Sequence, residues 1–196
     1  MTTMKRLFIG IPVKSKIIEK FALKWVNDPL LNQNRMKWVR PENWHVTLYF
    51  LGNTPESEID DLQQFIDESF NQILSFSTNL NEVGVFPKIS NPKVLWLGLE
   101  NIQPLLAGYN RLGELLRQNG FAIDNKPLKP HMTLARINSI EHRDSIESLL
   151  MEYGQFIFDS VAINRVVLYE SILTPKGPVY QPLFVKVMET EKKEPT

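Results

Sequence analysis

Apolar residues recur along this chain with two spacings, one typical of helices and the other typical of strands. In residues 14–27, Ile17, Ile18, Phe21 and Trp25 recur at spacings of three and four, which predicts a helix with one buried face. The apolar run at residues 5–12 is short and ends in proline, which favours a buried strand over a helical turn.

The same two patterns continue to the end of the chain. Further strands are expected at residues 36–39, 44–51, 76–86, 93–99, 131–137, 156–169 and 179–187. Further helices are expected at residues 55–74 with Thr54 as the N-cap, at residues 105–116 with Asn119 and Gly120 ending the helix, and at residues 139–153. This alternation predicts an α+β fold.

No glycine-rich or low-complexity linker divides the chain into independent domains. Residues 1–188 are therefore expected to form one domain. The last residues, 189–196, are mostly charged and predict a disordered tail.

Composition narrows the function classes. The 22 Lys and Arg residues balance 22 Asp and Glu residues, which argues against a protein that grips long duplex nucleic acid but allows a local anion pocket. The absence of cysteine excludes disulfides, thiolate zinc sites and a cysteine nucleophile. The apolar run after Lys5 and Arg6 is too short for a signal peptide or a membrane span, so we expect a soluble cytoplasmic protein without membrane contact.

One four-residue pattern occurs twice, as His45-Val46-Thr47-Leu48 and as residues 131–134, His-Met-Thr-Leu. Alternate side chains of a strand share a face, so each copy presents an imidazole and a hydroxyl on the same side. If the two halves of the chain are related by a pseudo-twofold axis, both pairs face one cleft.

Two facing imidazoles suit a reaction that removes one proton and delivers another near neutral pH. Phosphodiester cleavage is such a reaction. One neutral histidine would activate a water or hydroxyl, and the other, protonated, would protonate the leaving oxygen. The hydroxyls of Thr47 and Thr133 would bind the non-bridging phosphate oxygens, and no metal or other cofactor is required.

Two alternatives compete with this interpretation. A single His-x-Thr in a strand is usually structural, but the two copies use two of the three histidines, and the third, His142, lies in a polar stretch typical of a solvated helix. A zinc site needs a third ligand beside His45 and His131, and neither copy has the spacing or the acidic neighbour of known metallohydrolase signatures.

With both motifs, the chain resembles the 2H phosphoesterase superfamily, and within it the RNA 2′,3′-cyclic phosphodiesterases, also called 2′-5′ RNA ligases. The resemblance spans nearly the whole chain. It is carried by the segments RLFI at residues 6–9, NWHVTLYFLG at 43–52, VLWLG at 94–98, KPHMTLAR at 129–136 and LYES at 168–171.

This resemblance implies a bilobal fold in which two lobes of antiparallel sheet, with helices outside, each contribute one motif to a central cleft. It implies that His45 is the proton donor and His131 the proton acceptor. It also implies hydrolysis of 2′,3′-cyclic phosphate ends to 2′-phosphates, with slow 2′-5′ joining of RNA ends in some members.

Two further residues are candidates near the motifs. The family often places an arginine near the phosphate where Arg136 stands, but its offset of five from His131 gives the wrong face in a straight strand and requires a bulge. Tyr49 shares the parity of His45 and Thr47 and is the first candidate to stack on a base, whereas Trp44 and Phe50 are expected on the buried side.

The predicted partners are RNA ends or nucleotides with a 2′,3′-cyclic phosphate, tRNA fragments among them, and the protein is expected to be a monomer. Two other functions stay open. One is 2′-5′ RNA ligation as the main role, and the other is non-catalytic RNA or nucleotide binding in the same cleft.

Overall fold

The computed structural model describes residues 3–175 and 177–190, in which nine strands form one sheet. The strands are β1 (Met4–Pro12), β2 (Arg35–Trp38), β3 (His45–Pro55), β4 (Phe76–Phe86), β5 (Val94–Leu99), β6 (His131–Ser139), β7 (Ile157–Ile163), β8 (Arg165–Thr174) and β9 (Gly177–Val187). The α-helices are α1 (Lys16–Val26), α2 (Pro29–Gln33), α3 (Ile59–Phe70), α4 (Gln103–Gln118) and α5 (Arg143–Tyr153).

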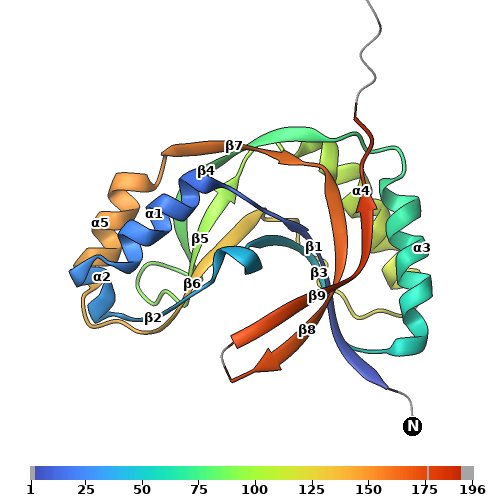
Figure 1. Ribbon diagram of the computed structural model, residues 1–196, viewed down its shortest axis with the longest axis horizontal. Coiled ribbons are helices and arrows are strands. Elements are labelled where there is room, and N and C mark those ends of the chain that lie inside the picture. The colour runs from blue at the N-terminus through green and yellow to red at the C-terminus, as the bar shows by residue number, and fades with distance from the viewer. Residues whose placement is uncertain (1–2, 176, 191–196) are drawn as a thin grey trace, which may run out of the picture.

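The sheet is antiparallel and has two lobes. Its order is β7-β4-β5-β6-β3-β1-β8-β9, with β2 paired to β6 beside this path. The two lobes meet at β3 and β6, whose ladder among the described residues consists of one pair, Val46 and Met132. Figure 1 shows the sheet bent into an arch, with α1, α2 and α5 at one end and α3 and α4 at the other. The prediction of a bilobal α+β fold is confirmed.

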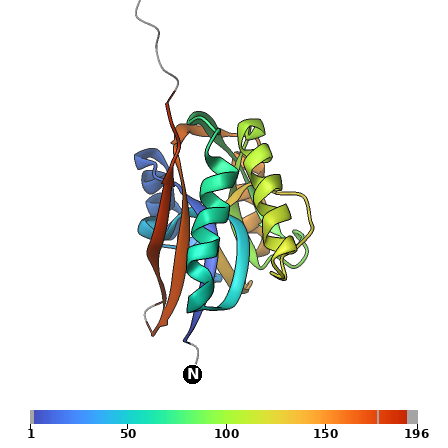
Figure 2. The ribbon, with the colours of Figure 1, turned by 90° about the vertical axis from the view of Figure 1, so that its right-hand side faces the viewer.

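The helices cross between the lobes. α1 follows β1 of the first lobe but packs on β7 of the second. α4 follows β5 of the second lobe but packs on α3, which lies over β8 and β9 of the first. Figure 2 shows α3 and α4 side by side. Neither lobe is therefore a continuous stretch of chain.

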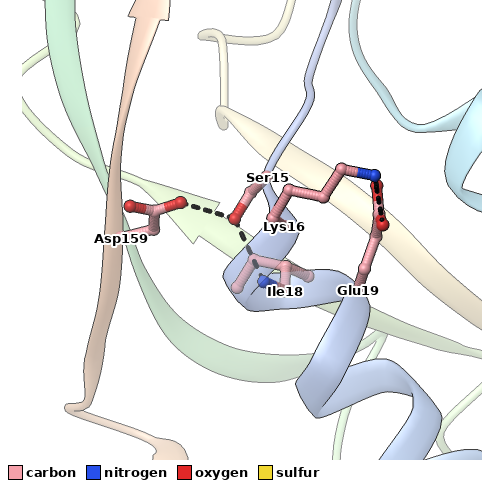
Figure 3. A network of polar contacts seen from close by, with 5 residues as sticks. All are labelled: Ser15, Lys16, Ile18, Glu19 and Asp159. Carbon is pink, nitrogen blue, oxygen red and sulfur yellow. Dashed lines mark hydrogen bonds and ion pairs between the residues drawn. The ribbon is translucent and has the colours of Figure 1, made fainter.

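The start of α1 is fixed to the opposite lobe by a polar network (Figure 3). The Ser15 hydroxyl accepts a hydrogen bond from the Ile18 backbone N–H at 3.0 Å, which caps the helix, and donates one to Asp159 of β7 at 2.5 Å. On the exposed side, Lys16 and Glu19 form an ion pair at 2.9 Å. The cap thus sets where the chain turns away from β1.

The core lies between the sheet and the helices. α3 buries Leu62, Ile66 and Phe70 completely, as the three- and four-residue spacing requires. Burial of such a side chain contributes about 1.5–3 kcal/mol to stability.

No helix among the described residues is long and apolar enough to cross a membrane.

The predicted helix at residues 55–74 begins later than expected. Thr54 is not an N-cap, because it lies in β3, pairs with Lys5 and is buried. The chain leaves the strand at Pro55, passes through a short 3-10 turn and enters α3 at Ile59. The threonine and proline signal marks the end of a strand here, not the first turn of the helix.

Two other boundaries differ from the sequence prediction. The expected strand at residues 156–169 is two strands, because β7 pairs with β4 at one end of the sheet whereas β8 pairs with β1 and β9 near the other. The chain changes partner at Asn164. The expected helix at residues 139–153 begins only at Arg143, and the short helix α2 was not predicted.

Of the predicted tail at residues 189–196, only Glu189 and Thr190 lie among the described residues. Glu189 forms a bridge to Leu74, and its carbonyl accepts a hydrogen bond from the Ser75 N–H at 2.7 Å. Residues 191–196 lie outside the described residues.

Candidate active site

The two His-x-Thr motifs lie side by side at the junction of the lobes. Val46 and Met132 pair across the junction and are buried, so the residues that flank each of them point to the opposite face of the sheet. That face carries a cleft of about 990 Å³, which is lined by both histidines and both threonines. The structure therefore brings the two predicted pairs into one site.

Each histidine is anchored in the same way. The Nδ1 atom of His45 lies 2.7 Å from the carbonyl oxygen of Asn43, and Nδ1 of His131 lies 2.7 Å from that of Lys129. A carbonyl oxygen can only accept, so Nδ1 carries a proton in both rings. The other nitrogen, Nε2, is then the atom that accepts or donates a proton in the cleft.

Both motif strands contain a bulge directly after the threonine. The ladder between β1 and β3 skips Leu48, and the ladder between β5 and β6 skips Leu134. An extra residue reverses which side chains face the cleft from that point on. The two lobes thus share the histidine, the threonine and the bulge.

The bulge brings Arg136 to the cleft. Arg136 lies five residues after His131, beyond the bulge, and it is exposed and lines the cleft. The bulge that the sequence analysis requires for a cleft-facing Arg136 is therefore present. Phe50 occupies the matching position in the first lobe, five residues after His45, and 67% of its side chain is exposed.

The same kind of bulge separates Tyr49 from the face of His45 and Thr47, on which its predicted base-stacking role rests. The bulge at Leu48 turns Tyr49 into the core, where 5% of it is exposed and its ring stacks on Tyr109 with centroids 4.6 Å apart. Its hydroxyl donates to the Tyr109 carbonyl at 3.0 Å. Phe50 and Tyr49 have therefore exchanged their expected orientations, since Phe50 is exposed on the cleft face and Tyr49 is buried. Trp44 is buried as predicted.

Aromatic rings surround both histidines. The His45 ring contacts Phe8 and Tyr180, with centroids 4.8 and 5.1 Å apart. The His131 ring contacts Phe86 at 4.9 Å, and Lys129 lies over the Phe86 ring at 4.8 Å. These contacts restrict the rotation of both imidazoles.

The cleft is positive in a protein without net charge. Six cationic side chains line it, against two carboxylates; the cations are Arg6, Lys37, Arg40, Lys126, Lys129 and Arg136. The carboxylates offset two of the cations, because Glu42 pairs with Arg40 and Asp124 pairs with Lys126. The remaining charge favours an anionic ligand.

Burial lowers the pKa of His45 below its ordinary range. The hydrogen bond to the Asn43 carbonyl opposes this shift, whereas the nearby charges of His131 and Arg136 add to it. The net direction favours a neutral His45 in the free protein. A phosphate anion in the cleft would act in the opposite direction and raise the pKa.

The threonines leave their hydroxyls available. Thr47 and Thr133 are half-buried, and neither hydroxyl bonds to any other group in the part of the chain that the structure describes. Within residues 3–175 and 177–190, no three His, Cys, Asp or Glu side chains gather in a group that could hold a metal ion. His142 is exposed at the start of α5, outside the cleft.

Sequence reasoning did not find Phe8, Phe86 and Tyr180. They come from β1, β4 and β9, and their contact with the histidines depends on strand pairing. An apolar or aromatic residue in a strand gives no signal that separates such a contact from ordinary core packing.

Comparison with known proteins agrees with the geometry. The family model described as the 2′-5′ RNA ligase superfamily matches residues 16–171. The RNA 2′,3′-cyclic phosphodiesterase of Thermotoga maritima is 32% identical over 179 residues, which cover 91% of this chain and 93% of that protein. The one of Archaeoglobus fulgidus is 32% identical over 180 residues, covering 92% and 98%.

Solved structures show the same fold. TT0787 of Thermus thermophilus is 28% identical, with a TM-score of 0.73 over 95% of this chain and 100% of that chain. E. coli LigT complexed with 3′-AMP has a TM-score of 0.75 at 24% identity, over 95% of this chain and 99% of that chain. Together with the paired motifs, these matches show that the chain belongs to the 2′-5′ RNA ligase superfamily of 2H phosphoesterases.

Proposed function

We propose that this protein is an RNA 2′,3′-cyclic phosphodiesterase that hydrolyses the cyclic phosphate to a 2′-phosphate. The observation that carries the proposal is the pair of imidazoles in one cleft, each with Nδ1 held by a backbone carbonyl and Nε2 left to exchange a proton. The relatives that bear this name and match most of the chain support it.

In the proposed reaction, neutral His131 accepts a proton through Nε2 from a water molecule whose oxygen attacks phosphorus. The bond between phosphorus and O3′ breaks, and protonated His45 gives its proton to O3′. The product carries a 2′-phosphate and a 3′-hydroxyl. Solvent then returns the proton to His45 and removes one from His131.

The remaining groups bind the phosphate. The hydroxyls of Thr47 and Thr133 donate to the non-bridging oxygens, one from each lobe. Arg136 adds a positive charge that offsets the negative charge on phosphorus oxygens in the transition state. The anionic substrate also raises the pKa of His45, which makes it a competent donor in the complex.

The test is turnover of a 2′,3′-cyclic nucleotide in excess chelator, with the product isomer identified by chromatography. The expected product is the 2′-phosphate. His45→Ala and His131→Ala should each lower kcat by about 10²–10⁴-fold, the usual contribution of a general acid or base. His142→Ala is the matched control and should stay within about twofold of the wild type, since that histidine is exposed outside the cleft.

Several results would reject the proposal. They are turnover that needs added metal, a 3′-phosphate as the main product, or a histidine variant that keeps most of the rate. Nucleotide binding without turnover, unaffected by loss of a histidine, would instead support the non-catalytic alternative.

Arg136 provides a second test. Arg136→Gln should lower kcat/KM by about tenfold to a hundredfold, because a charged hydrogen bond to phosphate is lost. Arg143→Gln is its control, since Arg143 is exposed and hydrogen-bonds Ser90 away from the cleft. Equal effects of the two substitutions would contradict a specific role for Arg136.

Ligation through a 2′-5′ bond is the same displacement of O3′ with a 5′-hydroxyl of a second RNA in place of water, and the family description favours it as a second activity. Incubation of RNA halves, one with a 2′,3′-cyclic phosphate and one with a 5′-hydroxyl, would measure the ratio of joined to hydrolysed product. tRNA fragments, a cytoplasmic location and a monomeric state stay predictions. Size-exclusion chromatography with light scattering tests the last of these.

A further inference from the structure

Tyr180 stands out among the residues around the two histidines. It lies on β9, opposite Ser171 of β8, and its half-buried side chain lines the cleft. Its ring is nearly perpendicular to that of His45, at 85°, and to that of Phe8, at 75°. The centroid distances of 5.1 and 4.9 Å fix the Tyr180 ring at the wall of the site.

The hydroxyl of Tyr180 has no protein partner among the described residues. By contrast, the hydroxyls of Tyr49 and Tyr109 donate to backbone carbonyls, and that of Tyr153 accepts from Lys24. A half-buried tyrosine hydroxyl usually has a hydrogen-bond partner. In the cleft, that partner is a ligand or water.

Tyr169 provides an internal comparison. Its ring belongs to the same aromatic cluster, 5.0 Å from Phe8, and its hydroxyl also lacks a partner within the described chain. However, Tyr169 does not line the cleft, and the positive charge that acts on its phenol is Arg165. The two tyrosines therefore differ mainly in access to the site.

The charges around Tyr180 suit an anion. Burial raises the pKa of its phenol, so the hydroxyl remains a donor at neutral pH. The charges of Arg136 and Arg6 act in the opposite direction, and both residues line the same cleft as Tyr180. The cleft thus offers an anionic ligand two guanidinium groups and the phenol hydroxyl.

In the second lobe, no tyrosine ring packs against His131 among the described residues. The ring that stands perpendicular to His131 belongs to Phe86, at 87°, which has no hydroxyl. Otherwise the lobes match in histidine, threonine and bulge. The additional donors are thus split, with Arg136 from the second lobe and Tyr180 from the first.

We propose that Tyr180 is a phosphate-binding residue, whose hydroxyl donates a hydrogen bond to a non-bridging oxygen of the substrate phosphate beside Thr47. The proposal rests on the proposed function, because it assigns a further contact in the same site. It also gives the hairpin of β8 and β9 a role, since this hairpin carries Tyr180 to the cleft.

The experiment compares Tyr180→Phe with Tyr169→Phe, because both keep the ring and remove only a hydroxyl. Turnover of adenosine 2′,3′-cyclic phosphate gives kcat and KM, and calorimetric titration with adenosine 2′-monophosphate gives a Kd. Tyr180→Phe should lower kcat/KM and weaken the Kd by about tenfold or more, the usual effect of losing a hydrogen bond to a charged group. Tyr169→Phe should change neither by more than about twofold.

The outcomes separate this proposal from the proposed function. If the wild type turns over and Tyr180→Phe matches it in kcat/KM and Kd, or if Tyr169→Phe loses as much, the assignment of Tyr180 is wrong. If the wild type does not turn over, the proposed function fails, and the Kd alone decides for or against Tyr180. An unchanged shape of the pH profile for Tyr180→Phe would support binding of phosphate over an indirect effect through His45.

Discussion

At the scale of single residues, the hydrogen bond from each Nδ1 to a backbone carbonyl decides what each histidine can do. Both rings present the same nitrogen to the cleft, so their roles differ by protonation and not by orientation. The lowered pKa of His45 favours the neutral form in the free protein, whereas the predicted donor role requires the charged one. Binding of the anionic substrate must therefore raise the pKa of His45 until the charged form is populated.

A substrate with sulfur in place of O3′ tests the donor role of His45. A thiolate leaves without a proton, so general-acid catalysis contributes little to its departure. On this substrate His45→Ala should recover at least about tenfold of the activity that it loses on the oxygen substrate, whereas His131→Ala should recover little. Rates for both substrates under single-turnover conditions measure this. Recovery of activity in His131→Ala alone would show that His131 is the proton donor and His45 the proton acceptor.

The same pKa shift predicts how stability depends on pH. The unfolded chain, with an imidazole pKa of about 6.5, binds more protons than the folded protein as the pH falls. The contribution of His45 to stability is therefore complete above about pH 6.5 and is lost as the pH falls toward its folded pKa. Between about pH 7.5 and about pH 5, the wild type should lose more free energy of unfolding than His45→Gln. Equal losses in urea titrations would contradict the shift.

At the scale of elements, the sequence predicted which residues carry the two motifs better than it predicted which way the neighbouring side chains face. The two motifs and their shared face follow from the period of a strand, which is local. The places of Tyr49, Phe50 and Arg136 depend on the bulges at Leu48 and Leu134, which no local pattern marks. A bulge is fixed by how neighbouring strands fit together, so the parity rule fails beyond it.

The missed boundaries have a similar cause. Asn164 interrupts a run that reads as one strand, because the two parts find partners at different ends of the sheet. Thr54 has the local chemistry of a helix cap, but pairing with Lys5 keeps it in a strand. In both places tertiary pairing overrides a local signal.

The cross-strand pair of Gly84 and Trp96 yields a prediction about β4 and β5. A Cβ atom on Gly84 would collide with Cζ2 of Trp96, whose ring stacks on Phe86. Gly84→Ala should therefore destabilise the fold by about 1–3 kcal/mol. Combined with Trp96→Phe, which removes the obstructing ring, it should cost clearly less. Additive effects in chemical denaturation would show that the contact is not the cause.

At the scale of the whole molecule, the exchanged helices tie the lobes together. α1 leaves the first lobe to cover the second, and α4 does the reverse. Unfolding of either lobe removes packing from the other. We therefore expect the protein to unfold as one cooperative unit, although its sheet is joined at the centre by a single residue pair among the described residues.

We expect one thermal transition with equal calorimetric and van't Hoff enthalpies. The average for globular proteins gives about 0.7 kcal/mol per residue near 60 °C, or about 140 kcal/mol for this chain of 196 residues. Differential scanning calorimetry measures both enthalpies. Two resolved transitions would mean that the lobes unfold independently despite the exchange.

The carbonyl anchors of the two histidines also explain why the alignment of the imidazoles is not visible in the sequence. The anchoring residue is Asn43 in one motif and Lys129 in the other, and the bond is the same because only the main chain takes part. Any amino acid has a carbonyl group, so the anchor itself requires no particular side chain at this position. The path of the main chain just before each strand therefore aligns the imidazole, and a comparison of side chains alone would not reveal this anchor.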